Sequence, residues 1–200
     1  PTTSSAASDV YKRQEQMRQA YRDMLVTTTG LSDYISGAIL FDETIRQKLL
    51  DGTPFPDFLS ANGIIPGIKV DAGAKVLAGH ADEKVTEGLD GLRDRLAEYY
   101  AMGARFSKWR AVITIGDNIP SMACLEANAH GLARYAMLSQ EAGIVPIVEP
   151  EVLMDGSHSI VRCYEVTELA QRMTFQQLKA QGVVLAVSYT HLTLPTMLWV

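Results

Sequence analysis

Short apolar segments and longer segments of helical pattern alternate along this 200-residue chain. Each apolar segment is bounded by Gly, Pro or Asp, as strands usually are. The four strand-like segments cover residues 36–41, 63–71, 104–115 and 143–153. They recur at intervals of roughly 30 to 40 residues, which is typical of successive βαβ units. The chain is therefore expected to be an α/β protein built on a parallel sheet.

The segments between and beside these strands have the period of amphipathic helices. In one of them Leu89, Leu92 and Leu96 recur at three- and four-residue steps and form one apolar stripe. Ser121 is the expected N-cap of the next helix, and glycines that tolerate a left-handed conformation follow the helical patterns. The expected helices cover residues 13–28, 86–103, 121–143 and 157–182.

Composition excludes several classes of protein. The net charge of -5, with basic residues scattered along the chain, argues against a nucleic-acid surface. No apolar run approaches the roughly 20 residues of a membrane span, and the first residues lack the apolar core of a signal peptide. Cys124 and Cys163 have no ligand-type spacing. We expect buried free thiols, with neither a disulfide nor a zinc site, in a reducing cytoplasm.

Charged residues lie inside the strand-like segments, where apolar residues are expected. Because side chains alternate along a strand, Lys108 shares one face with Arg110, and Glu149 shares one face with Glu151. Lys69 lies near the end of another strand. Isolated charges in an apolar setting are costly, so we expect opposite charges to meet. Lysines and carboxylates gathered in this way are the groups that acid–base chemistry needs.

Each of these charges, taken alone, is more often a solvated loop residue or part of a structural ion pair. The agreement of three neighbouring strands favours a site, because ligands bind at the C-terminal ends of parallel strands. The alternation of strands and helices is compatible with both a doubly wound sheet and a (β/α)8 barrel. Glycine-rich phosphate motifs are absent, and charges inside strands favour the barrel. The four histidines are too scattered to predict a metal site.

Six motifs together resemble class I fructose-bisphosphate aldolase, the metal-independent enzyme of glycolysis. The resemblance extends from about Arg13 to about Leu185. It is carried by "GAILFDETI", "GIIPGIKVD", "TEGLDGLRDR", "FSKWRAV", "EANAHGLARYA" and "GIVPIVEPEVLMDGSH". It implies a partial (β/α)8 TIM barrel, roughly strands 2 to 5 with their helices. It also implies a lyase that cleaves fructose 1,6-bisphosphate reversibly into dihydroxyacetone phosphate and glyceraldehyde 3-phosphate through a lysine Schiff base, without a cofactor.

The resemblance also implies a role for each charged residue in the strands. Lys69 and Arg110 would bind a substrate phosphate and hydroxyls. Lys108 would stabilise negative charge beside the nucleophile, and Glu149 would act as general acid and base during Schiff base formation. Glu151 would orient the nucleophilic lysine. The resemblance thus implies that Lys108, Glu149 and Glu151 are the catalytic residues, and that Lys69 and Arg110 bind substrate.

The sequence departs from the family where the Schiff-base lysine is expected. The family carries that lysine after the third helix, in a segment like "EGxxLKPN", but no lysine follows Lys179. The earlier strand with "LAADES" and the later phosphate loops are also missing. We therefore expect this chain to be inactive alone. The alternative is a non-catalytic, aldolase-derived module that binds sugar phosphates or a protein.

Residues 1–13 and 187–200 read as a leader and a tail foreign to the domain, because neither has an amphipathic pattern continuous with its neighbour. Residues 14–186 are then the partial aldolase barrel. For a full-length relative the resemblance implies a homotetramer in the cytoplasm, or in a plastid, with a sugar-phosphate substrate. It implies no nucleic-acid or membrane partner.

Overall fold

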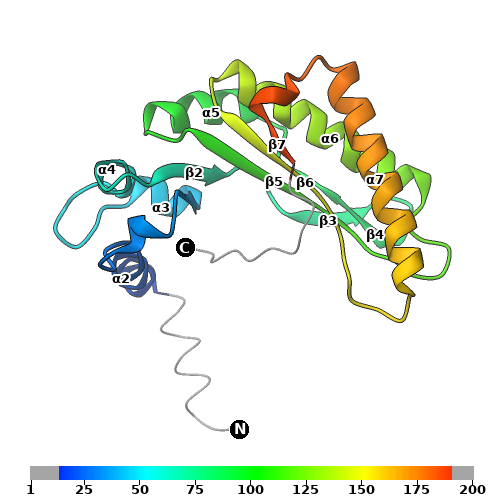
Figure 1. The fold of residues 1–200 in the computed structure, drawn as a ribbon, viewed down its shortest axis with the longest axis horizontal. Helices are drawn as coiled ribbons and strands as arrows, with labels where there is room; N and C mark the ends of the chain where they lie inside the picture. Colours follow the sequence, from blue (N-terminus) through cyan, green and yellow to red (C-terminus); the bar gives the residue numbers. More distant parts are fainter. Residues whose placement is uncertain (1–13, 191–200) are drawn as a thin grey trace, which may run out of the picture.

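The computed structural model describes residues 14–190 and contains a five-stranded sheet, a separate hairpin and a layer of helices (Figure 1). The sheet has the order β1-β2-β5-β6-β7, and all its neighbouring strands are parallel. The strands of the sheet are β1 (Gly37–Leu40), β2 (Ile65–Lys69), β5 (Phe106–Ile113), β6 (Val145–Val152) and β7 (Tyr189–Thr190). The antiparallel hairpin is formed by β3 (Ala74–Leu77) and β4 (His80–Thr86).

The long helices follow the strands as the sequence predicts. They are α2 (Glu15–Val26), α5 (Leu92–Ala101), α6 (Met122–Glu141) and α7 (Ile160–Ala180). Ser121 caps α6, because its side chain accepts a hydrogen bond from the Cys124 backbone N–H. Figure 1 shows α5, α6 and α7 along one side of the curved sheet. The prediction of four parallel strands connected by helices is confirmed.

Helix α6 packs on β5 and β6 and determines which way their side chains point. The Ser107 hydroxyl lies 2.9 Å from both the Tyr135 hydroxyl and the Ser139 hydroxyl of α6. Trp109 stacks on Tyr135 with ring centroids 5.4 Å apart. Ser107 and Trp109 therefore face the helices. By alternation along the strand, Lys108 must face the opposite side of the sheet.

The hairpin corrects one prediction from the sequence. The polar sequence "DEKVTEGLD" predicts a solvated segment, but its first part belongs to β4, and Glu83 and Thr86 are only 4% and 6% exposed. Glu83 Oε1 accepts a hydrogen bond of 2.6 Å from the Ser121 backbone N–H at the start of α6. Because the segment is mostly polar, its sequence does not reveal that another element covers it.

Four short helices and the chain ends complete the description. The helices α3 (Asp42–Arg46) and α4 (Phe55–Ala61) were not predicted, since one or two turns show too little periodicity. The short 3-10 helix η1 spans Leu31–Asp33, and a second, η2, spans Leu185–Val187 before β7. The predicted leader, residues 1–13, lies outside the described residues, as do residues 191–200 of the predicted tail. Those boundaries stay predictions. No helix within residues 14–190 is both long and apolar enough to cross a bilayer.

The two cysteines are free thiols in different environments. Cys124 is buried, as predicted, whereas Cys163 is only half-buried. Burial raises the pKa of the Cys124 thiol to about 11, and the nearby Glu83 carboxylate adds to the shift. At pH 8 the thiolate of Cys124 is therefore a small minority.

We predict that iodoacetamide at pH 8 alkylates Cys163 well before Cys124, because only the thiolate reacts and Cys124 is also inaccessible. Peptide mass spectrometry over a time course measures both rates in one sample. Urea-unfolded protein is the control, in which the two rates should become similar. Equal rates in the folded chain would show that the hairpin does not cover the start of α6.

Candidate active site

The residues predicted to form a site lie on one face of the sheet, the face opposite α6. Lys69 of β2 is aligned with Lys108 of β5, and Arg110 is aligned with Glu149 of β6. Residues aligned across neighbouring strands share a face. Glu151 shares it too, two positions beyond Glu149. The structure thus brings together all five predicted residues, from three adjacent parallel strands.

Lys108 and Glu149 form a buried ion pair at the centre of this face. Lys108 Nζ lies 3.0 Å from Glu149 Oε2, and the two side chains are 0% and 2% exposed. Neither oxygen of the Glu149 carboxylate has a hydrogen-bond partner among the described residues, so its contact with Lys108 is an ion pair. A lysine and a carboxylate in contact, both out of water, form a pair through which a proton can move during acid–base chemistry.

Arg110 and Glu151 form a second pair nearer the C-terminal ends of the strands. The Arg110 Nε–H donates to Glu151 Oε2. This hydrogen bond raises the pKa of the Arg110 guanidinium, against the opposing effect of burial, with smaller contributions from Glu149 and Asp71. The Thr86 hydroxyl of the hairpin donates to the Arg110 carbonyl at 2.7 Å. The hairpin therefore holds the strand that carries this arginine.

Lys69 is paired with an acid that the sequence did not single out. Its Nζ lies 2.5 Å from Asp71 Oδ1 and 3.0 Å from the Asp71 carbonyl oxygen. The Asp71 side chain is 3% exposed, and its Oδ1 also accepts from the Gly73 backbone N–H at 3.0 Å. The signal that could have found it is its place just past the end of β2, where a parallel sheet binds ligands.

The arrangement suits an anionic, oxygen-rich ligand better than a metal ion. Two lysines and an arginine meet three carboxylates within one part of a sheet face. In the described part of the chain, no group of three His, Cys, Asp or Glu residues lies close enough to hold a metal ion. Ammonium and guanidinium groups bind phosphate strongly, and acid–base pairs move protons.

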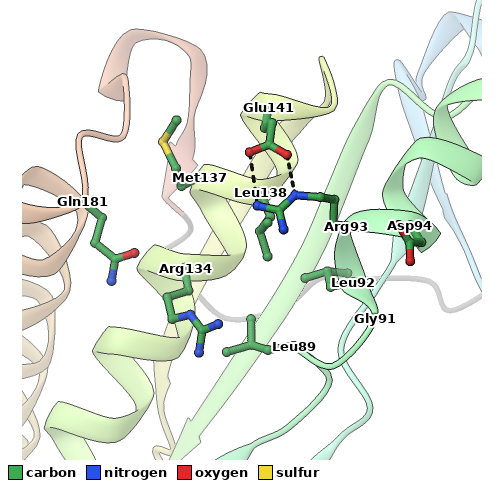
Figure 2. A pocket seen from close by; sticks show the side chains of 10 residues that line it. All are labelled: Leu89, Gly91, Leu92, Arg93, Asp94, Arg134, Met137, Leu138, Glu141 and Gln181. Atoms are coloured by element: carbon green, nitrogen blue, oxygen red, sulfur yellow. Dashed lines mark hydrogen bonds and ion pairs between the residues drawn. The ribbon is translucent and has the colours of Figure 1, made fainter.

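A separate cavity of about 410 Å³ lies between α5 and α6 (Figure 2). Figure 2 shows two of its lining side chains, Arg93 and Glu141, in direct contact, with Arg93 Nε 2.6 Å from Glu141 Oε1. Both side chains are more than half exposed. None of the five predicted site residues lines this cavity, so we do not assign the chemistry to it.

Comparison with known proteins decides the family. The sequence profile of fructose-bisphosphate aldolase class-I matches residues 9–197. This chain belongs to the class I fructose-bisphosphate aldolase family. Its sequence is 67% identical over 171 residues to a probable fructose-bisphosphate aldolase class 1 of Xanthomonas axonopodis pv. citri, covering 86% of this chain and 51% of that protein. It is 53% identical to the cytosolic fructose-bisphosphate aldolase 6 of Arabidopsis thaliana, covering 86% and 48%.

A solved structure of an aldolase confirms the fold. The fructose-bisphosphate aldolase of Plasmodium falciparum, crystallised with TRAP and a small-molecule inhibitor, matches with a TM-score of 0.84 and 47% identity. The match covers 86% of this chain and 50% of that one. The chain spans about half the length of the relatives it matches, and its fold is a partial (β/α)8 barrel. The catalytic and binding roles of the five residues stay predictions.

We predict that replacing Lys108 with Met lowers the free energy of unfolding by about 3–5 kcal/mol, because it leaves the Glu149 carboxylate buried without its cation. The double variant Lys108→Met/Glu149→Leu should recover most of the loss. Urea unfolding followed by circular dichroism measures both.

The matched control is Arg93→Met, which breaks the exposed pair with Glu141 and should change stability little. A Lys108→Met variant as stable as the wild-type chain would show that this pair is open to water.

Proposed function

We propose that this chain supplies the substrate-binding and proton-transferring part of a class I fructose-bisphosphate aldolase active site. The observation that carries the proposal is the convergence of Lys69, Lys108 and Arg110 with Glu149 and Glu151 on one sheet face. Membership of the aldolase family supports it. The substrate class is a sugar phosphate, and no cofactor is required.

Two of the cations would bind the anionic parts of the substrate. Lys69 and Arg110 lie on different strands and are more exposed than Lys108, with 17% and 29% of their side chains accessible. A phosphate dianion that reaches both gains charge-assisted hydrogen bonds. Arg110 exchanges part of its pairing with Glu151 for the ligand, and this exchange leaves a carboxylate ready to accept another donor.

The central pair would handle protons. When an amine adds to the substrate carbonyl, the resulting carbinolamine loses water only if its hydroxyl receives a proton. Glu149 would supply this proton and take it back, and Lys108, whose Nζ lies 3.0 Å from Glu149 Oε2, would stabilise the carboxylate and negative charge on the substrate oxygen. Glu151 would orient the attacking amine.

The attacking amine is the part this sequence does not carry at its family position, since no lysine follows Lys179. We therefore propose that the chain alone binds substrate but does not complete the Schiff-base reaction. The same observation favours a second candidate, a non-catalytic module that binds sugar phosphates. For a full-length protein with this sequence we propose a homotetramer in the cytoplasm. The cytosolic location named for the Arabidopsis relative supports the compartment.

We predict that the wild-type chain binds fructose 1,6-bisphosphate and that Lys69→Met weakens binding by about 10-fold or more, as loss of a hydrogen bond to a charged group does. Isothermal titration calorimetry measures the affinity. Arg93→Met is the control, because it removes an equal charge far from the site and should bind like wild type. If titration of the wild-type chain gives no heat of binding, both candidate functions are wrong.

A second measurement separates enzyme from binding module. With dihydroxyacetone phosphate and borohydride, the Xanthomonas relative should form a trapped covalent adduct, whereas this chain should form none while still binding the ligand. The absent family lysine is the physical reason. An adduct at the rate of the relative, located by peptide mass spectrometry, would show that another lysine serves as the nucleophile.

A further inference from the structure

Charge balance identifies an additional residue on the substrate face. The five predicted residues carry three positive and two negative charges, so one of the three cations has no carboxylate partner among the five. Asp71 supplies that charge. Its carboxylate lies 2.5 Å from Lys69 Nζ and also acts on Arg110, whose pKa it helps to raise. The acid is therefore part of the same electrostatic unit as the two cations proposed to bind phosphate.

Asp71 also limits the direction in which Lys69 can donate. A lysine ammonium has three N–H donors. Asp71 takes two of them, one with its carbonyl oxygen at 3.0 Å and one with Oδ1 at 2.5 Å. The remaining donor is held in one direction instead of rotating freely, which lowers the entropic cost of binding an acceptor there.

The backbone around Asp71 keeps its carboxylate in place. Asp71 Oδ1 accepts from the Gly73 N–H at 3.0 Å, and the Ala72 N–H donates to the Glu87 carbonyl at 2.8 Å. At Gly88, where φ is +128°, an added Cβ would lie 2.7 Å from the Ala72 nitrogen and 3.2 Å from the Asp71 Cα. The loop thus packs against another backbone segment with no room for a side chain.

One oxygen of this fixed carboxylate has no donor. The Asp71 side chain is only 3% exposed, and its Oδ2 is buried. Even so, Oδ2 has no hydrogen-bond partner among the described residues. A buried acceptor without a donor costs free energy, so the site gains when a ligand brings one. A hydroxyl group is such a donor. A phosphate dianion is not, and it is repelled by the carboxylate.

We propose that Asp71 is a specificity-determining residue, which orients Lys69 toward a phosphate and accepts a hydrogen bond from a hydroxyl near that phosphate. It thereby selects hydroxylated phosphate esters over phosphates on a bare carbon chain. The inference rests on the proposed function, because it places the sugar phosphate on the face that carries Lys69.

The test compares two bisphosphates of equal length in the full 200-residue chain. Fructose 1,6-bisphosphate carries hydroxyls, and hexane-1,6-diol bisphosphate carries the same phosphates on a six-carbon chain without them. The wild-type chain should bind the sugar bisphosphate at least about 10-fold more tightly. Asp71→Asn should weaken binding of the sugar bisphosphate by about 10-fold and that of the diol bisphosphate much less, since the diol loses only the orientation of Lys69 and is also freed from repulsion. Calorimetry measures all four affinities.

A merely structural role of Asp71 would weaken binding of both ligands by the same factor, and that result would overturn the inference. Glu141→Gln is the matched control, because it removes one negative charge from an exposed pair with Arg93 and should leave both affinities unchanged. If Asp71→Asn does not fold, the wild-type comparison still decides, because equal affinities for the two bisphosphates contradict the selection. Binding of neither ligand to wild type would overturn the proposed function itself, a distinct outcome.

Discussion

The buried ion pair between Lys108 and Glu149 is the interaction on which the candidate site depends. Neither charge would be stable alone in its surroundings, because moving an ion out of water costs several kcal/mol. The pair therefore requires that β5 and β6 keep one register. In that register Lys108 is aligned with Ile147, and its side chain reaches diagonally to Glu149. A shift by one residue would turn one of the two charges toward the helices.

Contacts on the opposite face of the sheet, which α6 covers, require the same register of β5 and β6. Tyr135 of α6 donates to the Ser107 and Ile147 carbonyls of β5 and β6 at 2.8 and 3.1 Å, and so joins the two strands to one helix. The polar hydroxyls of Ser107 and Ser139 complete a buried network. Helix packing and ion pairing thus favour the same register of β5 and β6. This register keeps the charged side chains together on one face of the sheet.

The β3–β4 hairpin contacts both β5 and α6. Thr86 holds the Arg110 backbone, and the Asn128 amide of α6 donates to the Lys84 carbonyl at 2.8 Å. Such contacts hold β4 against α6 beside the strand that carries the arginine. In the closed barrels of the family, the face that carries Lys108 would line the interior, and the edge strands β1 and β7 would meet further strands. The chain therefore contains all five predicted site residues but only part of the wall that would enclose them.

The sequence alone determined the class of fold, the family, and which charged side chains of one strand lie on the same face of the sheet. Alternation places Lys108 with Arg110 and Glu149 with Glu151 whatever lies around them, and helix periodicity located α6 and its cap at Ser121. The roles assigned to these residues remain predictions.

Only the tertiary structure decided which charges pair. Arg110 is aligned with Glu149 yet donates a hydrogen bond to Glu151, and Lys69 is paired with Asp71, which was not among the predicted site residues. It also revealed that Glu83 is buried beneath α6. The physical reason is that periodicity is a local property of the chain, whereas the choice of a partner depends on how close elements distant in sequence come in space and on how much water they exclude.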